Sequence, residues 1–162
     1  MNFGLRLAAV FLTGMACTSA FANDVVTINV SGTMARAPCT LTSSKTFSAS
    51  FGSILTDQIN SASSIDIPIT LNCPANSSLN ISVKASGVYQ GTPTIATTTK
   101  DNLVYTLRWK SDGTSADLQG VPLKLTNQSG NVNLSLTAKL LAITAQTPGS
   151  FTASSVISIE YL

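Results

Sequence analysis

The sequence predicts an all-β fold of the sandwich type. Three features predict it: short segments of alternating apolar and polar residues, turn-forming residues between them, and a charged content of only 10% beside abundant serine and threonine. An alternation with a period of two turns one face of a strand toward a core and the other toward water. Many short strands separated by turns are typical of a β-sandwich.

The first 22 residues are predicted to be a secretory signal peptide. Arg6 is the only charged side chain among them, residues 7–16 are apolar, and residues 20–22 read Ala-Phe-Ala. This small-x-small pattern predicts cleavage after Ala22, and the apolar run is too short to span a membrane. The alternative is a lipoprotein signal in which Cys17 carries the lipid, although Gly14 stands where such signals prefer a bulky aliphatic residue.

Two cysteines, Cys39 and Cys73, are left after cleavage. An even number of cysteines in an exported chain predicts one disulfide, and the alternative is a pair of free buried thiols. The bridge would close a loop of about 35 residues and stabilise the fold by roughly 3–4 kcal/mol in the chain-entropy model.

Residues 23–162 are enough for one domain with a sizeable core. Pro68 predicts a bend or a sheet edge, and a short helical turn is expected around residues 54–62. Turn-forming residues are expected to separate strands at 111–113, 127–131 and 147–150. The predicted strands, in chain order, are 25–34, 38–42, 45–54, 63–73, 78–88, 102–110, 121–126, 132–143 and 151–162.

Residues that carry chemistry are scarce. The chain has no histidine, which removes the usual general base and the commonest metal ligand. Its seven acidic residues are scattered, and no phosphate-binding loop or nucleophile elbow is present. Loss of Arg6 leaves eight basic residues, without a basic run. We therefore expect no enzyme activity, no catalytic or metal site, no cofactor and no nucleic-acid partner.

The N-terminal segment of the mature chain has a strand pattern with an unusual glycine. Gly32 falls in phase with the apolar residues of the segment, where a strand normally presents a side chain. A glycine in a strand often marks the close approach of another backbone. Alternation alone is also consistent with a first strand in the chain's own sheet. The residues on this face are Val26, Ile28, Val30, Gly32 and Met34.

The C-terminal segment shows a matching pattern. Phe151, Ile157, Ile159 and Tyr161 share one phase, and Tyr161 is the penultimate residue. The sequence thus stops within a strand pattern, and no later segment is there to pair with it. A long unpaired edge strand promotes aggregation unless something covers it.

With these features the sequence resembles subunits of chaperone–usher pili, the fimbrial pilins of the type 1 and P pilus kind. The resemblance spans the mature chain, and each of its elements is weak alone while their order is specific. They are the signal peptide, the extension with Gly32, Ala-Pro-Cys at 37–39, Phe-Gly-Ser-Ile at 51–54, the segment leading into Cys73, Gly149 fourteenth from the end, and Tyr161.

The resemblance implies an incomplete immunoglobulin-like sandwich that lacks its last strand and is completed by a donor strand from another subunit. It implies three regions: signal peptide 1–22, donor-strand extension 23–37 and pilin domain 38–162. Val26, Ile28, Val30 and Met34 would enter the groove of a neighbouring subunit, and Gly32 would pass a shallow place in it. The residues implied to contact a chaperone or to form the chain's own groove are Gly149, Phe151, Ile157, Ile159, Tyr161 and Leu162.

The partners implied by the resemblance are a periplasmic chaperone, an outer-membrane usher and neighbouring pilus subunits. The chain would pass through the periplasm and be assembled head to tail in a fimbrium on the cell surface, where it supports adhesion. The position in the pilus is open between a shaft subunit, a minor or adapter subunit and a base terminator. Low aromatic content and modest length suit a shaft or an adapter subunit equally, and we favour a minor or adapter subunit. The alternative is a self-contained secreted β-sandwich, an adhesin or lectin-like domain, in which Tyr89, Tyr105 and Trp109 contact a ligand.

Overall fold

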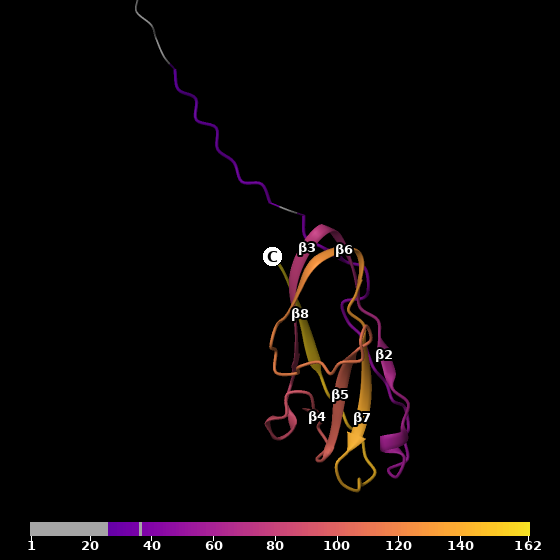
Figure 1. The fold of residues 1–162 in the computed structure, drawn as a ribbon. Helices are drawn as coiled ribbons and strands as arrows, with labels where there is room; N and C mark the ends of the chain where they lie inside the picture. Colours follow the sequence, from indigo (N-terminus) through magenta and orange to yellow (C-terminus); the bar gives the residue numbers. More distant parts are fainter. Residues whose placement is uncertain (1–25, 36) are drawn as a thin grey trace, which may run out of the picture. The chain divides into compact units, whose positions relative to one another are not determined.

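A computed structural model describes residues 26–35 and 37–162 of the chain. The predicted signal peptide lies outside the described residues. The chain divides into two units, Met1–Met34 and Ala35–Leu162, and each is considered by itself. The second unit is a two-layered β-structure (Figure 1). None of its described helices is long or apolar enough to span a membrane.

The first sheet is organised around one long strand, β3 (Thr70–Ala85). β6 (Leu123–Asn133) pairs with it over most of its length. Two further strands also pair with β3, β1 (Thr40–Leu41) at Leu71 and Asn72, and β8 (Ser155–Tyr161) from Leu79 to Ala85. All of these pairings are antiparallel. Because β3 is the only strand paired with β8 among the described residues, the ladder of the C-terminal strand depends on β3.

The second sheet has the order β2-β7-β5-β4. Its strands are β2 (Ile65–Ile67), β7 (Leu136–Ala142), β5 (Leu103–Trp109) and β4 (Ala96–Thr97). β7 is paired on both sides, with β2 and with β5. The predicted sandwich is therefore confirmed as two antiparallel sheets, and the chain passes several times from one to the other.

The core lies between the two sheets and consists of the inward-facing residues of their strands. Leu71, Leu79 and Ile81 of β3 are at most 1% exposed, and Leu103 and Leu136 of the second sheet are at most 2% exposed. Full burial of one such side chain contributes about 1.5–3 kcal/mol. The alternating apolar residues read from the sequence thus provide the core of this domain.

The expected strand at residues 45–54 is wrong. No strand is assigned there, and Phe47 is 40% exposed. Gly52 has a φ of +64°, which interrupts an extended backbone. Alternation creates a face, but a strand also needs a neighbour to complete its hydrogen-bond ladder, and no ladder partner for this segment is found in the described part of the chain.

The expected turn at residues 127–131 is also wrong, because β6 continues through it. Asn127 and Gly130 do adopt positive φ values, 57° and 64°, as turn residues would. Here they accompany shifts of register between β3 and β6. Bulges admit such residues without ending a strand, so the local conformation was predicted correctly while its consequence was not.

The other elements follow the sequence more closely. The chain breaks at Pro68 between β2 and β3, as the proline predicts. The expected helical turn is the 3-10 helix η1 (Ile59–Ser61), and a second one, η2 (Tyr89–Gly91), was not expected. The second half of the strand predicted at 63–73 and most of the separate strand predicted at 78–88 join into one, because β3 continues through Asn76, whose φ is 61°.

Candidate functional site

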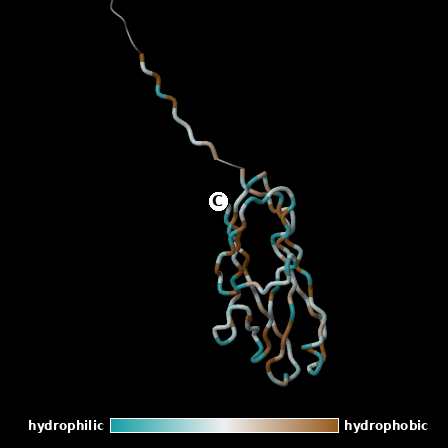
Figure 2. The backbone as a smooth tube through the Cα atoms, in the orientation of Figure 1, coloured by the Kyte–Doolittle hydropathy of each residue, from teal (hydrophilic) through white to brown (hydrophobic). Residues whose placement is uncertain are grey.

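Residues 26–34 form a segment of exposed apolar side chains. The structure assigns it no regular secondary structure, and apolar and more polar residues alternate along it in Figure 2. The exposed fractions are 83% for Val26, 80% for Ile28, 92% for Val30 and 105% for Met34. A Cβ added to Gly32 would meet no atom within 4 Å. The glycine is therefore not required by packing within the described residues.

β8 is a strand with a half-finished apolar face. Ile157 and Ile159 are partly buried against the core, and Tyr161, in phase with them, is 41% exposed. Their partners on β3 are Val83, Ile81 and Leu79, which are at most 1% exposed. β8 has no second strand neighbour in the part of the chain that the structure describes. Its inward side chains therefore lack cover on one side.

The C-terminal end of β8 is held to β3 by a backbone hydrogen bond beyond the last residue of the strand and by a side chain within it. At its C-terminal end, Leu162 donates its backbone N–H to the Ser78 carbonyl at 3.0 Å, and its side chain is 59% exposed. Glu160 accepts a hydrogen bond from the Asn80 side chain at 3.0 Å. β8 continues to the last residues of the sequence next to β3 (Figure 1). Leu162 therefore extends the hydrogen bonding between this half-covered strand and β3 by one residue.

The two remaining predicted groove residues, Gly149 and Phe151, precede β8. Phe151 is partly buried and packs against the core, but it lies outside the ladder. Gly149 is exposed, with a φ of +149°, and an added Cβ would lie 3.3 Å from the Lys100 ammonium. The strand is thus shorter than the predicted 151–162, although its inward face keeps the predicted phase.

The predicted disulfide is confirmed. Cys39 and Cys73 are bonded, with a Cα–Cα distance of 4.1 Å, and both are about 5% exposed. Cys39 directly precedes β1, and Cys73 lies in β3. The bridge therefore attaches the start of the domain to the central strand of the first sheet.

A cavity of about 450 Å³ lies next to the segment whose predicted strand did not form. Phe51 and Ile54 of the Phe-Gly-Ser-Ile motif line it, with Leu55 and Ile65. The rest of the lining is Ala62 together with hydroxyl and amide side chains, namely Ser50, Ser53, Gln58, Ser61 and Ser63. The motif noticed in the sequence therefore contributes partly exposed apolar surface instead of a paired strand.

The sequence did not predict a hydrogen-bonded contact between the two sheets. The hydroxyl of Tyr105, on β5, lies 2.7 Å from Ser155 Oγ and donates to the Ser154 carbonyl at 3.2 Å. Burial raises the pKa of Tyr105, and the hydrogen bond with Ser155 offsets part of this effect. Tyr105 and Trp109 are at most 9% exposed. This burial argues against the alternative in which both contact a ligand.

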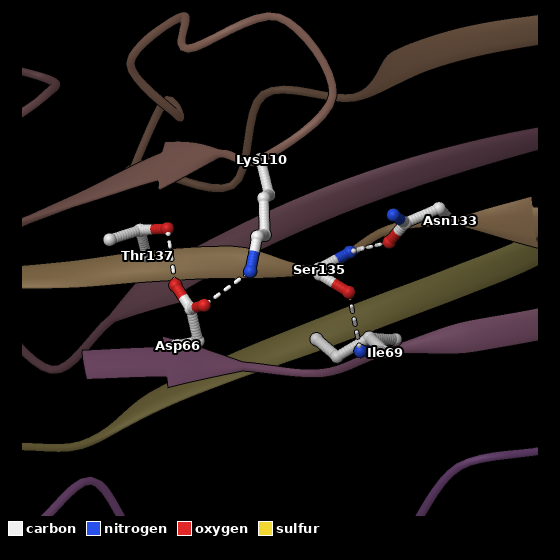
Figure 3. A network of polar contacts seen from close by, with 6 residues as sticks. All are labelled: Asp66, Ile69, Lys110, Asn133, Ser135 and Thr137. Atoms are coloured by element: carbon white, nitrogen blue, oxygen red, sulfur yellow. Dashed lines mark hydrogen bonds and ion pairs between the residues drawn. The ribbon is translucent and has the colours of Figure 1, made fainter.

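A polar network on the second sheet is structural. Asp66 of β2 pairs with Lys110 and accepts a hydrogen bond from Thr137 of β7 at 2.9 Å (Figure 3). The hydrogen bond from Lys110, then that from Thr137, lowers the pKa of Asp66 below 3.8. Within the described residues no three His, Cys, Asp or Glu side chains are grouped to hold a metal. The network joins β2 to β7 and to the residue that follows β5.

Comparisons with known proteins agree with this architecture. The family model described as Fimbrial protein matches residues 28–162. The chain belongs to the fimbrial protein family. This fimbrial protein is thus a structural subunit of a pilus, and the match covers both the exposed segment from Ile28 onward and the whole domain. No curated protein matches its sequence significantly.

Solved structures share the fold of this fimbrial protein. The rod subunit PapA of the P pilus matches with a TM-score of 0.63 at 20% identity, over 78% of this chain and 100% of PapA. A chain from a chaperone–usher pilus studied for rod uncoiling matches with a TM-score of 0.63 at 20% identity, over 91% of this chain and 100% of that chain. The P pilus adaptor subunit PapF matches with a TM-score of 0.58 at 18% identity, over 78% of this chain and 97% of PapF. The resemblance to chaperone–usher pilins is confirmed, and with it the open two-sheet fold.

Proposed function

We propose that this fimbrial subunit polymerises by donor-strand exchange. Residues 26–34 act as the donor strand, and the uncovered edge of β8 accepts the donor of a neighbouring subunit. The observation that carries the proposal is that both halves occur in one chain. One is an exposed alternating segment, and the other is a β8 face whose residues are only partly covered. Adding a strand to a free sheet edge is a recurring mode of recognition.

The energetics favour such an exchange. Burial of Val26, Ile28, Val30 and Met34 would contribute roughly 6–12 kcal/mol at about 1.5–3 kcal/mol for each side chain. Ladder hydrogen bonds add a smaller net amount, and ordering the extension offsets part of the gain. Because donor and acceptor lie on different surfaces of one chain, the contact is heterologous and produces a filament.

We further propose a periplasmic chaperone and an outer-membrane usher as assembly partners, with passage through the periplasm to the cell surface. A chaperone that covers β8 before assembly would protect an edge that otherwise promotes aggregation. Leu162 at the end of β8 is 59% exposed and is therefore accessible to such a partner. Removal of Tyr161 and Leu162 is expected to abolish the chaperone complex in a pull-down. An unchanged complex would contradict this role.

We place the chain among the minor or adapter subunits that support adhesion. Its fold is nearly as similar to the adaptor PapF as to the rod subunit PapA. The test is stoichiometry, measured by quantitative mass spectrometry of purified pili. A minor subunit is expected at a small fraction of the most abundant subunit, and a chain that forms most of the fibre mass would overturn this assignment.

A synthetic peptide of residues 23–37 tests the exchange itself. Added to the full chain, it is expected to raise the melting temperature by tens of degrees, because each kcal/mol of stabilisation gives about 2–8 °C. The matched control peptide carries Ile28→Asn and Val30→Asn, which keep the length and lose the apolar face. Equal melting temperatures with both peptides would show that β8 needs no donor.

A further inference from the structure

Tyr105 binds the start of β8 to the opposite sheet through its hydroxyl. Its backbone is fixed in β5 between β4 and β7, where it pairs with Ala96 and Leu140. Its hydroxyl donates to the Ser154 carbonyl at 3.2 Å and lies 2.7 Å from Ser155 Oγ. Because a phenol has one proton, donation to the carbonyl leaves Ser155 as the donor to the phenolic oxygen. One side chain of the second sheet thus binds two successive residues where β8 begins.

The rest of β8 has no such bond to the second sheet. Its residues 155–161 pair with β3 throughout. Beyond the strand, the Leu162 backbone N–H donates to the Ser78 carbonyl of β3 at 3.0 Å. Within the described residues, no side chain of the second sheet forms a hydrogen bond with residues 156–162. Hydrogen bonds therefore connect this strand to the second sheet at its start alone.

These bonds lie beside a space that side chains do not fill. A cavity of about 420 Å³ is lined there by Ala153 and six hydroxyl-bearing residues, among them Ser86, Thr99, Thr152 and Ser154. The Ser154 carbonyl also accepts the Ser86 backbone N–H at 3.1 Å, and Thr152 exchanges two hydrogen bonds of 2.9 Å with Thr99. Atoms that face a cavity lose dispersion contacts on that side. Polar bonds therefore replace much of the packing between the sheets at this place.

We infer that the Tyr105 hydroxyl is a positioning group for donor-strand exchange, which keeps the start of β8 in place before a donor arrives. The inference rests on the proposed function and adds a residue to it. On the free side of β8, Ile157 and Ile159 are only partly buried and hold the strand loosely. An edge that is already in place lowers the cost of ordering on binding. The apparent affinity falls with the fraction of chains whose edge is in place.

Tyr105→Phe removes the hydroxyl and keeps the ring in the core. The Ser154 carbonyl retains its bond from Ser86, and Ser155 is partly exposed, so its hydroxyl can bond to water. No buried polar group is left without a partner, and we expect the variant to fold. Tyr89→Phe is the matched control. Tyr89 is also partly buried, and its hydroxyl has no hydrogen bond in the described part of the chain.

The test measures how fast an immobilised peptide of residues 23–37 binds the full chain, by biolayer interferometry. We expect association with the Tyr105→Phe chain to be about fivefold slower, the factor that one hydrogen bond of usual net strength supplies. Dissociation should be unchanged, because the bound donor then holds β8 from its other side. The Tyr89→Phe chain should associate at the natural rate.

Each contrary outcome has a separate meaning. Equal association rates for the natural and Tyr105→Phe chains would overturn the inference and leave donor-strand exchange standing. A change confined to dissociation would assign the hydroxyl to the finished complex and would also overturn it. Failure of the peptide to bind the natural chain would overturn both proposals. If Tyr105→Phe does not fold, Ser155→Ala decides in its place, since it removes one of the two bonds outside the core. Slower association would support the inference, and an unchanged rate would overturn it.

Hydrogen exchange separates positioning from a general loss of stability, because it reports local opening. The Ser86 amide, which bonds to Ser154 beside the Tyr105 hydroxyl, should exchange faster in the free Tyr105→Phe chain. The Leu134 amide donates to the Ile69 carbonyl at 2.8 Å within the core and should accelerate less. A bound donor peptide should remove the difference at Ser86. Equal acceleration of both amides would show a general loss of stability and contradict the inference.

Discussion

β7 and β8 are strands of seven residues each, and both carry apolar side chains at alternate inward positions. β7 has a neighbour on each side, and its inward residues Leu136, Ala138 and Leu140 are at most 4% exposed. β8 has β3 on one side, and its inward residues stay partly exposed. The contrast shows that what sets the C-terminal strand apart is its missing neighbour and not its composition.

The largest expected effect comes from giving β8 the second neighbour that β7 already has. Residues 23–37 appended after Leu162 through a short Gly/Ser linker should fold back antiparallel to β8. The added burial is worth up to roughly 6–12 kcal/mol before the cost of ordering. Denaturant unfolding should therefore shift to markedly higher midpoints than for the chain alone.

The linker also tests the direction of the donor. A short connection allows an antiparallel return, whereas a parallel donor would have to span about 3.3 Å for each residue of β8 first. The control carries the same appended segment with Ile28→Asn and Val30→Asn. Comparable stability with and without the apolar residues would mean that β8 is already complete.

A smaller effect is the difference in unfolding free energy between one truncated side chain in β7 and one in β8. Leu140→Ala in β7 removes a fully packed side chain and is expected to cost about 2–5 kcal/mol of unfolding free energy. Ile159→Ala in β8 should cost less, about 1–2 kcal/mol, because part of that side chain is already in water. Urea titrations of both variants measure the difference.

The donor peptide should then change this ranking. With residues 23–37 bound, Ile159 becomes a core residue, and the cost of Ile159→Ala should approach that of Leu140→Ala. If the two costs are equal in the free chain, the half-covered state of β8 has no energetic consequence and the comparison fails.

The smallest expected effect concerns the second sheet, in which β2 pairs with β7. The hydrogen bonds from Lys110 and Thr137 lower the pKa of Asp66 below 3.8, so this carboxylate stabilises the fold above its unfolded pKa. That contribution is lost as the pH falls through the folded value. Asp66→Asn should therefore reduce the melting temperature slightly at pH 7 and have no effect at the acidic end. A gap between the two proteins that persists or widens toward low pH would contradict this linkage.

Local sequence patterns determined much of this protein. Alternation at Leu79, Ile81 and Val83 predicted a buried strand, because apolar residues at every second position lie on one face of a strand and that face is buried in a sheet. Two cysteines in an exported chain predicted the disulfide. The alternation around Gly32, together with the strand pattern at the C-terminus, pointed to the fimbrial family before any fold was known.

Tertiary structure decided the rest, since hydrogen-bond ladders and contacts depend on neighbours that are distant in sequence. Residues 45–54 alternate like a strand and form none, because no ladder partner is present in the described chain. Asn127 and Gly130 have turn conformations within a continuing strand, because β3 pairs across them. Tyr105 and Ser155 lie fifty positions apart, and only the stacking of two sheets brings their hydroxyls together at the start of β8.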